Sequence, residues 1–280
     1  MVQHNDEMLR KFRDLIKIKI EEGEYPISLR MIQEELGYKL LPINSEILDL
    51  IKSMGLEVRG VYYDIEIRPP REYEKIPELY YLTHVRNVPS MVEYGLLCRK
   101  LVEELGINHE SIADDEIVEK RKLKRTPDGK TLDEFVNLYF AKKPPMYWRI
   151  VSRAKNPREL CYVCVCKSVL LEPGVYFSDG NAASSRTKIY SGLKNLKHLN
   201  WEIIYDEFWY AFKPLYGKSL LIPDEEVKRL KQAEVLVPRK IPPEKIRRIV
   251  VSSSVVKTRL KEILGEGKII VEVDESFFWS

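Results

Sequence analysis

Glu234 is the acid whose surroundings point most directly to chemistry. It follows Ala233 and precedes Val235-Leu236-Val237, so one carboxylate stands in an apolar, β-branched run typical of a strand. Because alternate strand residues face water, Glu234 is either a solvent-side residue or a catalytic acid on a strand that lines a cleft. A preorganised carboxylate in such a cleft can stabilise positive charge that develops in a reaction. Three further acids are predicted to lie on loops or helix surfaces, namely Asp179, Asp206 and Glu207.

His84 and Lys143 are the other residues with suitable chemistry. His84 lies between an aromatic-rich strand and the start of a helix that Asn87 or Ser90 can cap, where backbone groups often meet a ligand. A lone histidine is nevertheless more often a structural hydrogen-bonding residue. Lys143 lies between Phe140-Ala141 and Pro145-Met146, and burial of an amine favours loss of its proton. Arg149 is the alternative source of a cation nearby.

A strongly basic run over residues 119–127 suggests contacts with phosphates. The cations proposed to bind nucleic acid are Lys120, Arg121, Lys122, Lys124, Arg149, Arg186 and Lys188. Beside Lys143, the side chains of Met146 and Tyr147, with Trp148, offer apolar and aromatic surfaces for a base taken out of its stack. The alternatives are a solvated charged face for the run and core packing for the two aromatic residues.

Two regions must position these residues. Residues 1–70 carry ten Lys and Arg against thirteen Asp and Glu, whereas residues 71–280 carry 36 against 30. The first region shows helical periodicity over 8–22, capped helices from Ser28 and Ser45, and a hairpin over 56–67, which together resemble a winged helix. We interpret it as a packing module more than a DNA reader, because its third helix is acidic. The second region, beginning after the Pro69-Pro70 linker, mixes strands and helices irregularly and predicts an α+β fold. Its predicted elements are a helix over 88–94 that ends at Gly95 and strands over 160–171, 233–237, 246–251 and 269–273.

Composition excludes several classes of protein. No apolar run approaches the ~20 residues that span a bilayer, and the polar start has no signal core, so a cytoplasmic protein without a membrane partner is expected. Cys161 and Cys164 have the spacing of a zinc half-site, but no second pair lies near. We therefore expect buried core cysteines and no metal. The chain has neither a Walker loop nor a glycine-rich dinucleotide fingerprint, so neither of these nucleotide-binding loops is predicted.

Four segments, in order and followed by Glu234, resemble the DarT family of single-stranded DNA ADP-ribosyltransferases. The resemblance covers roughly residues 77–252, and the four segments are Tyr80-Tyr81-Leu82-Thr83-His84-Val85-Arg86-Asn87, Tyr139 to Tyr147, Phe177 to Ala183, and Asn195 to Trp201. It implies the split-sheet ADP-ribosyltransferase fold for a transferase domain in residues 71–280, which follows the winged-helix-like module of residues 1–70. It also implies that His84, Val85, Arg86 and Lys143 contact NAD⁺ as a substrate and that Glu234 is catalytic.

Further expectations follow from the same resemblance. The family's motif has an arginine where this chain has Lys143, and that arginine is proposed to help take a proton from the modified base. A buried lysine loses its proton far more readily than an arginine, so Lys143 could serve as the general base. The expected reaction places ADP-ribose on a base of single-stranded DNA, preferably thymine, with guanine as the alternative. The family acts as a toxin that a macrodomain antitoxin neutralises, which implies such a partner. Three rivals stay open: an RNA 2′-phosphotransferase-like enzyme, a protein-directed ADP-ribosyltransferase, and an inactive relative that binds nucleic acid or a partner.

Overall fold

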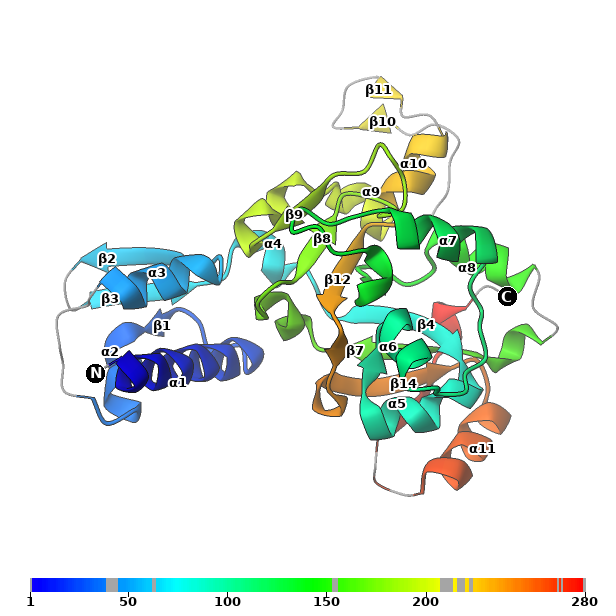
Figure 1. Ribbon diagram of the computed structural model, residues 1–280, viewed down its shortest axis with the longest axis horizontal. Helices are drawn as coiled ribbons and strands as arrows, with labels where there is room; N and C mark the ends of the chain where they lie inside the picture. The colour runs from blue at the N-terminus through cyan, green and yellow to red at the C-terminus, as the bar shows by residue number, and fades with distance from the viewer. Residues whose placement is uncertain are drawn as a thin grey trace.

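The computed structural model describes residues 2–38, 45–61, 64–152, 156–206, 214–215, 220–221, 224–265, 267 and 269–278. A small N-terminal lobe stands beside a larger one that contains an eight-stranded sheet (Figure 1). Glu207 lies outside the described residues, as do Tyr62 and Tyr63 of the hairpin predicted over 56–67.

The N-terminal lobe contains the three helices and the hairpin that the sequence predicts. They are α1 (Val2–Glu21), α2 (Leu29–Glu35), α3 (Ser45–Ser53), β2 (Glu57–Val61) and β3 (Asp64–Arg68). In α1 the side chains of Phe12, Ile16 and Ile20 recur every four residues and are fully buried, which explains why this stretch is an amphipathic helix. The sequence did not predict β1 (Ile27–Ser28), which pairs with β3 and makes the sheet order β1-β3-β2.

The large lobe is built on one mixed sheet, in agreement with the expected α+β class. Its order is β15-β14-β7-β4-β6-β12-β8-β9, and only β14 and β15 run parallel. The strands are β4 (Leu79–His84), β6 (Phe135–Tyr139), β7 (Leu160–Val165), β8 (Tyr176–Ser178), β9 (Ile189–Ser191), β12 (Glu234–Pro238), β14 (Ile246–Val251) and β15 (Ile270–Val273). All six residues of β7 are buried, as expected for a central strand covered on both faces.

The sheet splits between β4 and β6. These strands pair only at Tyr80 and Tyr139, whereas β4 pairs with β7 along its whole length and β6 pairs with β12 along its whole length. Past Tyr80 the two strands separate, and cavities open between them that are lined by residues of both, including Leu82 and Asn137. The split therefore supplies the cleft that a ligand needs.

Helices and short strands surround the sheet. They are α4 (Arg71–Glu74), α5 (Val88–Tyr94), α6 (Arg99–Glu104), α7 (Asp115–Leu123), α8 (Pro145–Val151), α9 (Trp201–Tyr205), α10 (Asp224–Leu230), α11 (Ser254–Leu264), and the pairs β5 (Leu96–Leu97) with β13 (Lys240–Ile241) and β10 (Pro214–Leu215) with β11 (Leu220–Leu221). The predicted end of α5 at Gly95 is confirmed. Gly95 has φ 85°, and a Cβ there would lie 2.1 Å from the Ile241 carbonyl oxygen.

Most predicted strands are confirmed, with different ends. The strand predicted over 160–171 stops at Val165, and the 3-10 helix η4 (Lys167–Leu171) replaces its second half. An apolar run cannot distinguish these two buried structures by periodicity alone. The four cysteines are buried and free, and the described residues contain no group of side chains suited to a metal ion.

The two lobes are joined by an interface (the seam) as well as by a linker. β3 ends at Arg68 and α4 begins at Arg71, so the proline pair interrupts the chain where the sequence predicts. Buried apolar residues of both lobes nevertheless form one continuous core. No helix within the described ranges has the length and apolar character needed to cross a membrane.

Candidate active site

Glu234 begins β12 and is buried, with only 2% of its surface exposed. The interpretation of Glu234 as a solvent-side residue was therefore wrong. Its neighbour across the sheet is Tyr139, and its backbone N–H donates to Ser178 Oγ at 3.2 Å. Burial and the nearby carboxylate of Glu234 raise the pKa of Tyr139, so the phenol stays protonated at neutral pH.

Two donors hold the carboxylate of Glu234. Arg121 Nη1 donates to Oε2 at 2.9 Å, and the Ala182 backbone N–H donates to Oε1 at 3.2 Å. The Arg121 side chain is only 14% exposed, so this ion pair lies away from bulk water. Within the described part of the chain, Arg121 Nη2 is buried and has no hydrogen-bond partner.

Two cavities with a shared wall lie near this carboxylate. One, of about 140 Å³, is lined by Glu234, Arg121 and Tyr139. A larger one, of about 520 Å³, is lined by His84, Arg86 and Glu159, among others. Both are lined by a shared set of residues, namely Ile112, Ala113, Asp114, Met146 and Ile150. The segment 112–114 and helix α8 thus form a common wall between the larger cavity and the cavity that contains Glu234.

His84 lies at the end of β4, in the larger cavity, with both ring nitrogens engaged. Nδ1 accepts the Arg86 backbone N–H at 3.2 Å, so Nε2 carries the proton and faces Glu159 Oε2 at 3.1 Å. A hydrogen bond from Arg259, ahead of the opposing effect of burial, lowers the pKa of Glu159. Val85 is buried and Arg86 is exposed, so of the four expected NAD⁺ contacts only His84 and Arg86 line the larger cavity.

Lys143 lies four residues beyond Tyr139, in a turn with a left-handed backbone of φ 57°. Such a conformation is unfavourable for a residue other than glycine. Its backbone N–H donates to Tyr162 Oη at 3.2 Å, which ties the turn to the aromatic core. Lys143 is half-buried and is not among the described residues that line either cavity.

The predicted nucleic-acid contacts fall on different faces of α8. Met146 lines both cavities, and Arg149 lines the larger one while pairing with Asp114. Tyr147 is 2% exposed and stacks on Tyr162, so the structure places it in the core. Trp148 is the exposed aromatic residue of this helix.

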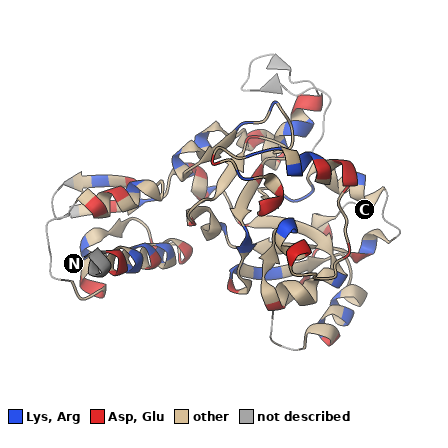
Figure 2. Ribbon diagram, viewed as in Figure 1, with Lys and Arg blue, Asp and Glu red and all other residues tan. Residues whose placement is uncertain are grey.

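The basic run is divided between surface and site. Lys120 pairs with Glu116 and Lys122 with Glu119 on the exposed face of α7 (Figure 2). Lys124 Nζ donates to the Ser184 carbonyl at 3.3 Å, which links the end of the run to the loop that carries Arg186 and Lys188. Arg121 turns inward to Glu234, a position unlike that of the lysines beside it.

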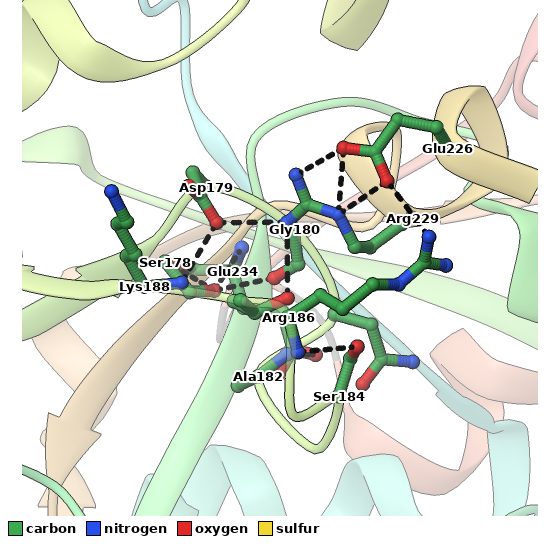
Figure 3. A network of polar contacts seen from close by, with 12 residues as sticks. Ser178, Asp179, Gly180, Ala182, Ser184, Arg186, Lys188, Glu226, Arg229 and Glu234 are labelled. Carbon is green, nitrogen blue, oxygen red and sulfur yellow. Dashed lines mark hydrogen bonds and ion pairs between the residues drawn. The ribbon is translucent and has the colours of Figure 1, made fainter.

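Sequence reasoning missed three contributors to this site. Arg121 was predicted only as one cation of a basic run, Ala182 only as part of a motif, and Arg229 not at all. Arg229 joins Asp179, Glu226 and Thr187 at the base of the loop that holds Ala182 (Figure 3). A pattern of single residues does not reveal these partners, because they come from α7, a loop and α10.

Comparison with known proteins matches residues 80–279 to the family model of DarT, the ssDNA thymidine ADP-ribosyltransferase. A DNA ADP-ribosyl transferase–DNA ADP-ribosyl glycohydrolase fusion protein of Thermosipho africanus is 35% identical over 74% of this chain and 50% of its own length. A DNA ADP-ribosyl transferase of Thermus sp. is 26% identical over 70% of this chain and 91% of its own. The chain thus spans about half of the fusion protein and most of the shorter relative.

Solved structures show the same fold. DarTG of Thermosipho africanus in complex with ADP-ribose matches with a TM-score of 0.60 and 34% identity, over 72% of this chain and 50% of that one. DarT of Thermus sp. in complex with ADP-ribosylated ssDNA matches with a TM-score of 0.61 and 22% identity, over 73% and 97%. The Thermus protein in complex with NAD⁺ matches with a TM-score of 0.58 and 21% identity, over 73% and 98%.

Proposed function

The chain belongs to the DarT family of single-stranded DNA ADP-ribosyltransferases, and on that basis we propose that it transfers ADP-ribose from NAD⁺ to a base of single-stranded DNA. The observation that carries this proposal is the buried carboxylate of Glu234 on the wall of a cleft opened by a split sheet. A charged acid is rarely left in such a place without a partner or a task.

Glu234 stabilises the positive charge that develops on the ribose when its bond to nicotinamide breaks. Each carboxylate oxygen has two lone pairs, and here each accepts one hydrogen bond, from Arg121 or from Ala182. One site on each oxygen therefore remains for a ribose hydroxyl or for electrostatic stabilisation of the sugar. The pair of donors keeps the carboxylate in one orientation before the substrate arrives.

The described residues suit NAD⁺ as a substrate. Arg121 lines the cavity, and its buried Nη2 can donate to an oxygen of the dinucleotide. Arg86 and Arg149 line the larger cavity, where they pair with Glu110 and Asp114, and their guanidinium groups can donate to the oxygens of a pyrophosphate. We assign the nicotinamide and its ribose to the smaller cavity, beside Glu234, and the rest of NAD⁺ to the larger one, beside His84.

Lys143 is proposed to accept the proton of the attacking base nitrogen. Its turn follows β6, whose last residue, Tyr139, is opposite Glu234. The exposed Arg149 on the neighbouring helix α8 is the alternative cation. Thymine is the proposed target, which the description of the family model supports, and guanine is the alternative.

A macrodomain-type antitoxin is the proposed partner, with this chain as the toxin. The support is the Thermosipho relative, in which a DNA ADP-ribosyl glycohydrolase is fused to the transferase. Removal of the modification by such an enzyme would restore the DNA. Coexpression with a macrodomain glycohydrolase should relieve growth inhibition by this chain, and no relief would contradict the pairing.

Incubation with NAD⁺ and four homopolymeric oligonucleotides tests the reaction. The thymine oligonucleotide should gain the mass of ADP-ribose, with release of nicotinamide. Modification of RNA or of the protein alone would favour the rival enzymes. A folded chain that consumes no NAD⁺ in the presence of any oligonucleotide would favour the inactive binding protein.

A further inference from the structure

Arg229 carries a permanent charge but is almost fully buried. Its side chain is 9% exposed and lies on α10, five residues before Glu234. Nη1 donates to Asp179 Oδ1 at 2.9 Å and to Thr187 Oγ1 at 3.1 Å. Nε and Nη2 donate to the carboxylate of Glu226 at 2.6–3.0 Å. A guanidinium that is withdrawn from water requires such pairing, and its planar fork can hold several acceptors at once.

The loop between Asp179 and Thr187 is fastened to this one residue. Arg229 contacts the first and last side chains of the loop, and its carbonyl oxygen accepts the Asn181 N–H at 3.0 Å. Gly180 lies so close that a Cβ there would be 2.6 Å from Arg229 Nη1 and 2.7 Å from the Arg229 carbonyl oxygen. Only glycine allows the loop to approach Arg229 this closely.

The same loop carries the donor to the acid. Ala182 lies one residue past Asn181, and its N–H reaches Glu234 Oε1. Ser178, just before the loop, accepts the Glu234 N–H and donates to the Gly180 carbonyl at 2.6 Å. Figure 3 shows these contacts as one continuous network from Glu226 through Arg229 and the loop to Glu234.

We propose that Arg229 is a positioning residue, which holds the loop 179–187 so that the Ala182 N–H fixes the orientation of the Glu234 carboxylate. The proposal rests on the proposed function in one respect, namely that Glu234 is the acting carboxylate. Without the loop, Arg121 alone would hold the acid through one oxygen. A displacement of about 1 Å at a reacting group can lower the rate about 10²-fold.

The same loop presents Arg186 and Lys188. Arg186 Nη1 lies 3.4 Å from Glu226 Oε2, so the acid that pairs with Arg229 also faces an exposed cation of the loop. Arg229 thereby links a proposed DNA-binding surface to the orientation of Glu234. Loss of Arg229 should affect both.

The test compares Arg229→Gln with wild type in two measurements. The first is hydrogen exchange of the Ala182 amide by NMR, which needs no activity. We expect exchange at least about tenfold faster, with unchanged exchange in β12 and β6. The second is transfer to a thymine oligonucleotide, in which kcat should fall about 10–100-fold. The KM for NAD⁺ should change less than about threefold, because Arg229 lines neither cavity.

Three further variants separate positioning from general stability. Arg229→Lys keeps the charge without the fork and should recover part of kcat. Asp179→Asn weakens the contact between the loop and Arg229, and should change Ala182 exchange and kcat in the same direction. This variant provides the test if Arg229→Gln does not fold. Arg30→Gln removes an arginine from an exposed ion pair with Glu34 in the N-terminal lobe and should behave as wild type.

Unchanged Ala182 exchange in folded Arg229→Gln and in Asp179→Asn would overturn the proposal, as would faster exchange with an unchanged kcat. If wild type transfers no ADP-ribose, the proposed function fails, while the exchange measurement still decides whether Arg229 holds the loop.

Discussion

The pair of Glu234 and Arg121 determines how variants of the active site should behave. Both side chains are largely buried, and each is the other's charge partner. Removal of one member of a buried pair leaves an uncompensated charge, which typically costs about 3–5 kcal/mol. The proposed catalytic acid therefore also contributes to the stability of the ligand-free fold.

We predict that Glu234→Ala lowers the free energy of unfolding by about 3 kcal/mol or more, and that Glu234→Gln costs less but is still destabilising. The glutamine keeps the size of the side chain and one oxygen that can accept from Arg121, but it is neutral and its NH₂ group cannot accept the Ala182 N–H. Chemical denaturation of the two variants and wild type measures the difference. Equal unfolding free energies for Glu234→Ala and wild type would mean that Arg121 finds another partner or water.

Lys143 gives the second prediction at this scale. Lys143→Ala should lower transfer about 10²-fold or more, as expected for loss of a general base, with little change in NAD⁺ affinity. Lys143→Arg restores the family's residue and should retain activity. Since lysine and alanine both have a Cβ, the left-handed backbone is equally unfavourable in wild type and Lys143→Ala. Transfer at the wild-type rate by Lys143→Ala would exclude the residue and direct attention to Arg149.

Single residues could be predicted where the local pattern is informative. An acid in an apolar strand identified Glu234, and ordered motifs identified the segment around His84. Nothing in the basic run distinguishes Arg121 from Lys120 or Lys122, because its inward direction depends on how α7 lies over the cleft. The contact between His84 Nε2 and Glu159 Oε2 is equally invisible in the sequence, since 75 residues separate them.

At the scale of elements, α7 combines a solvated outer face with one inward residue. Its lysines pair with acids one helical turn away, and exposed pairs of this kind contribute little to stability. They remain available to phosphates. Lys124, which contacts the loop of Arg186, would place the end of the run next to the proposed path of DNA.

Replacement of Lys120, Lys122 and Lys124 by glutamine should weaken binding of single-stranded DNA and reduce its dependence on salt. Three lost phosphate contacts should make the negative slope of log K against log salt concentration less steep by about 2. Binding titrations at several salt concentrations measure this slope, and NAD⁺ affinity serves as the control. An unchanged slope would mean that the run is only a solvated surface. Arg121 is left intact in this variant because it holds Glu234.

Most helices and strands could be predicted, but their ends and their partners could not. The period of buried residues predicted α1, and the glycine at position 95 predicted the end of α5. The 3-10 helix at Lys167–Leu171 was predicted as strand, because a continuous apolar run fits both structures. The split between β4 and β6 depends on strand pairing over long separations, which the family resemblance supplied and the local pattern did not.

At the scale of the whole molecule, the acidic N-terminal lobe is attached to the larger lobe by polar contacts as well as by apolar packing. Lys17 pairs with Glu172, and Glu21 accepts hydrogen bonds from Lys245 and Ser168. Burial raises the pKa of Glu21, but the hydrogen bonds from Lys245 and Ser168 outweigh it and lower the pKa overall.

Acid should therefore weaken this seam. Because the pKa of Glu21 is lowered on folding, its contribution to stability is present above about 4.5, the ordinary value, and is lost as the pH falls through the folded value. The difference in unfolding free energy between wild type and Glu21→Gln should shrink as the pH is lowered from about 6 to about 3. Denaturation curves at several pH values measure it. A difference that does not vary with pH would mean that Glu21 stabilises the seam by packing alone.

The proposed reaction depends on Glu234 as the group that stabilises the ribose during its transfer. The most direct measurement is the single-turnover rate of ADP-ribose transfer from NAD⁺ to a thymine oligonucleotide, compared between wild type and folded Glu234→Gln. We predict a loss of about 10²–10³-fold in the variant, with NAD⁺ still bound. Transfer by folded Glu234→Gln within about threefold of the wild-type rate would contradict the account.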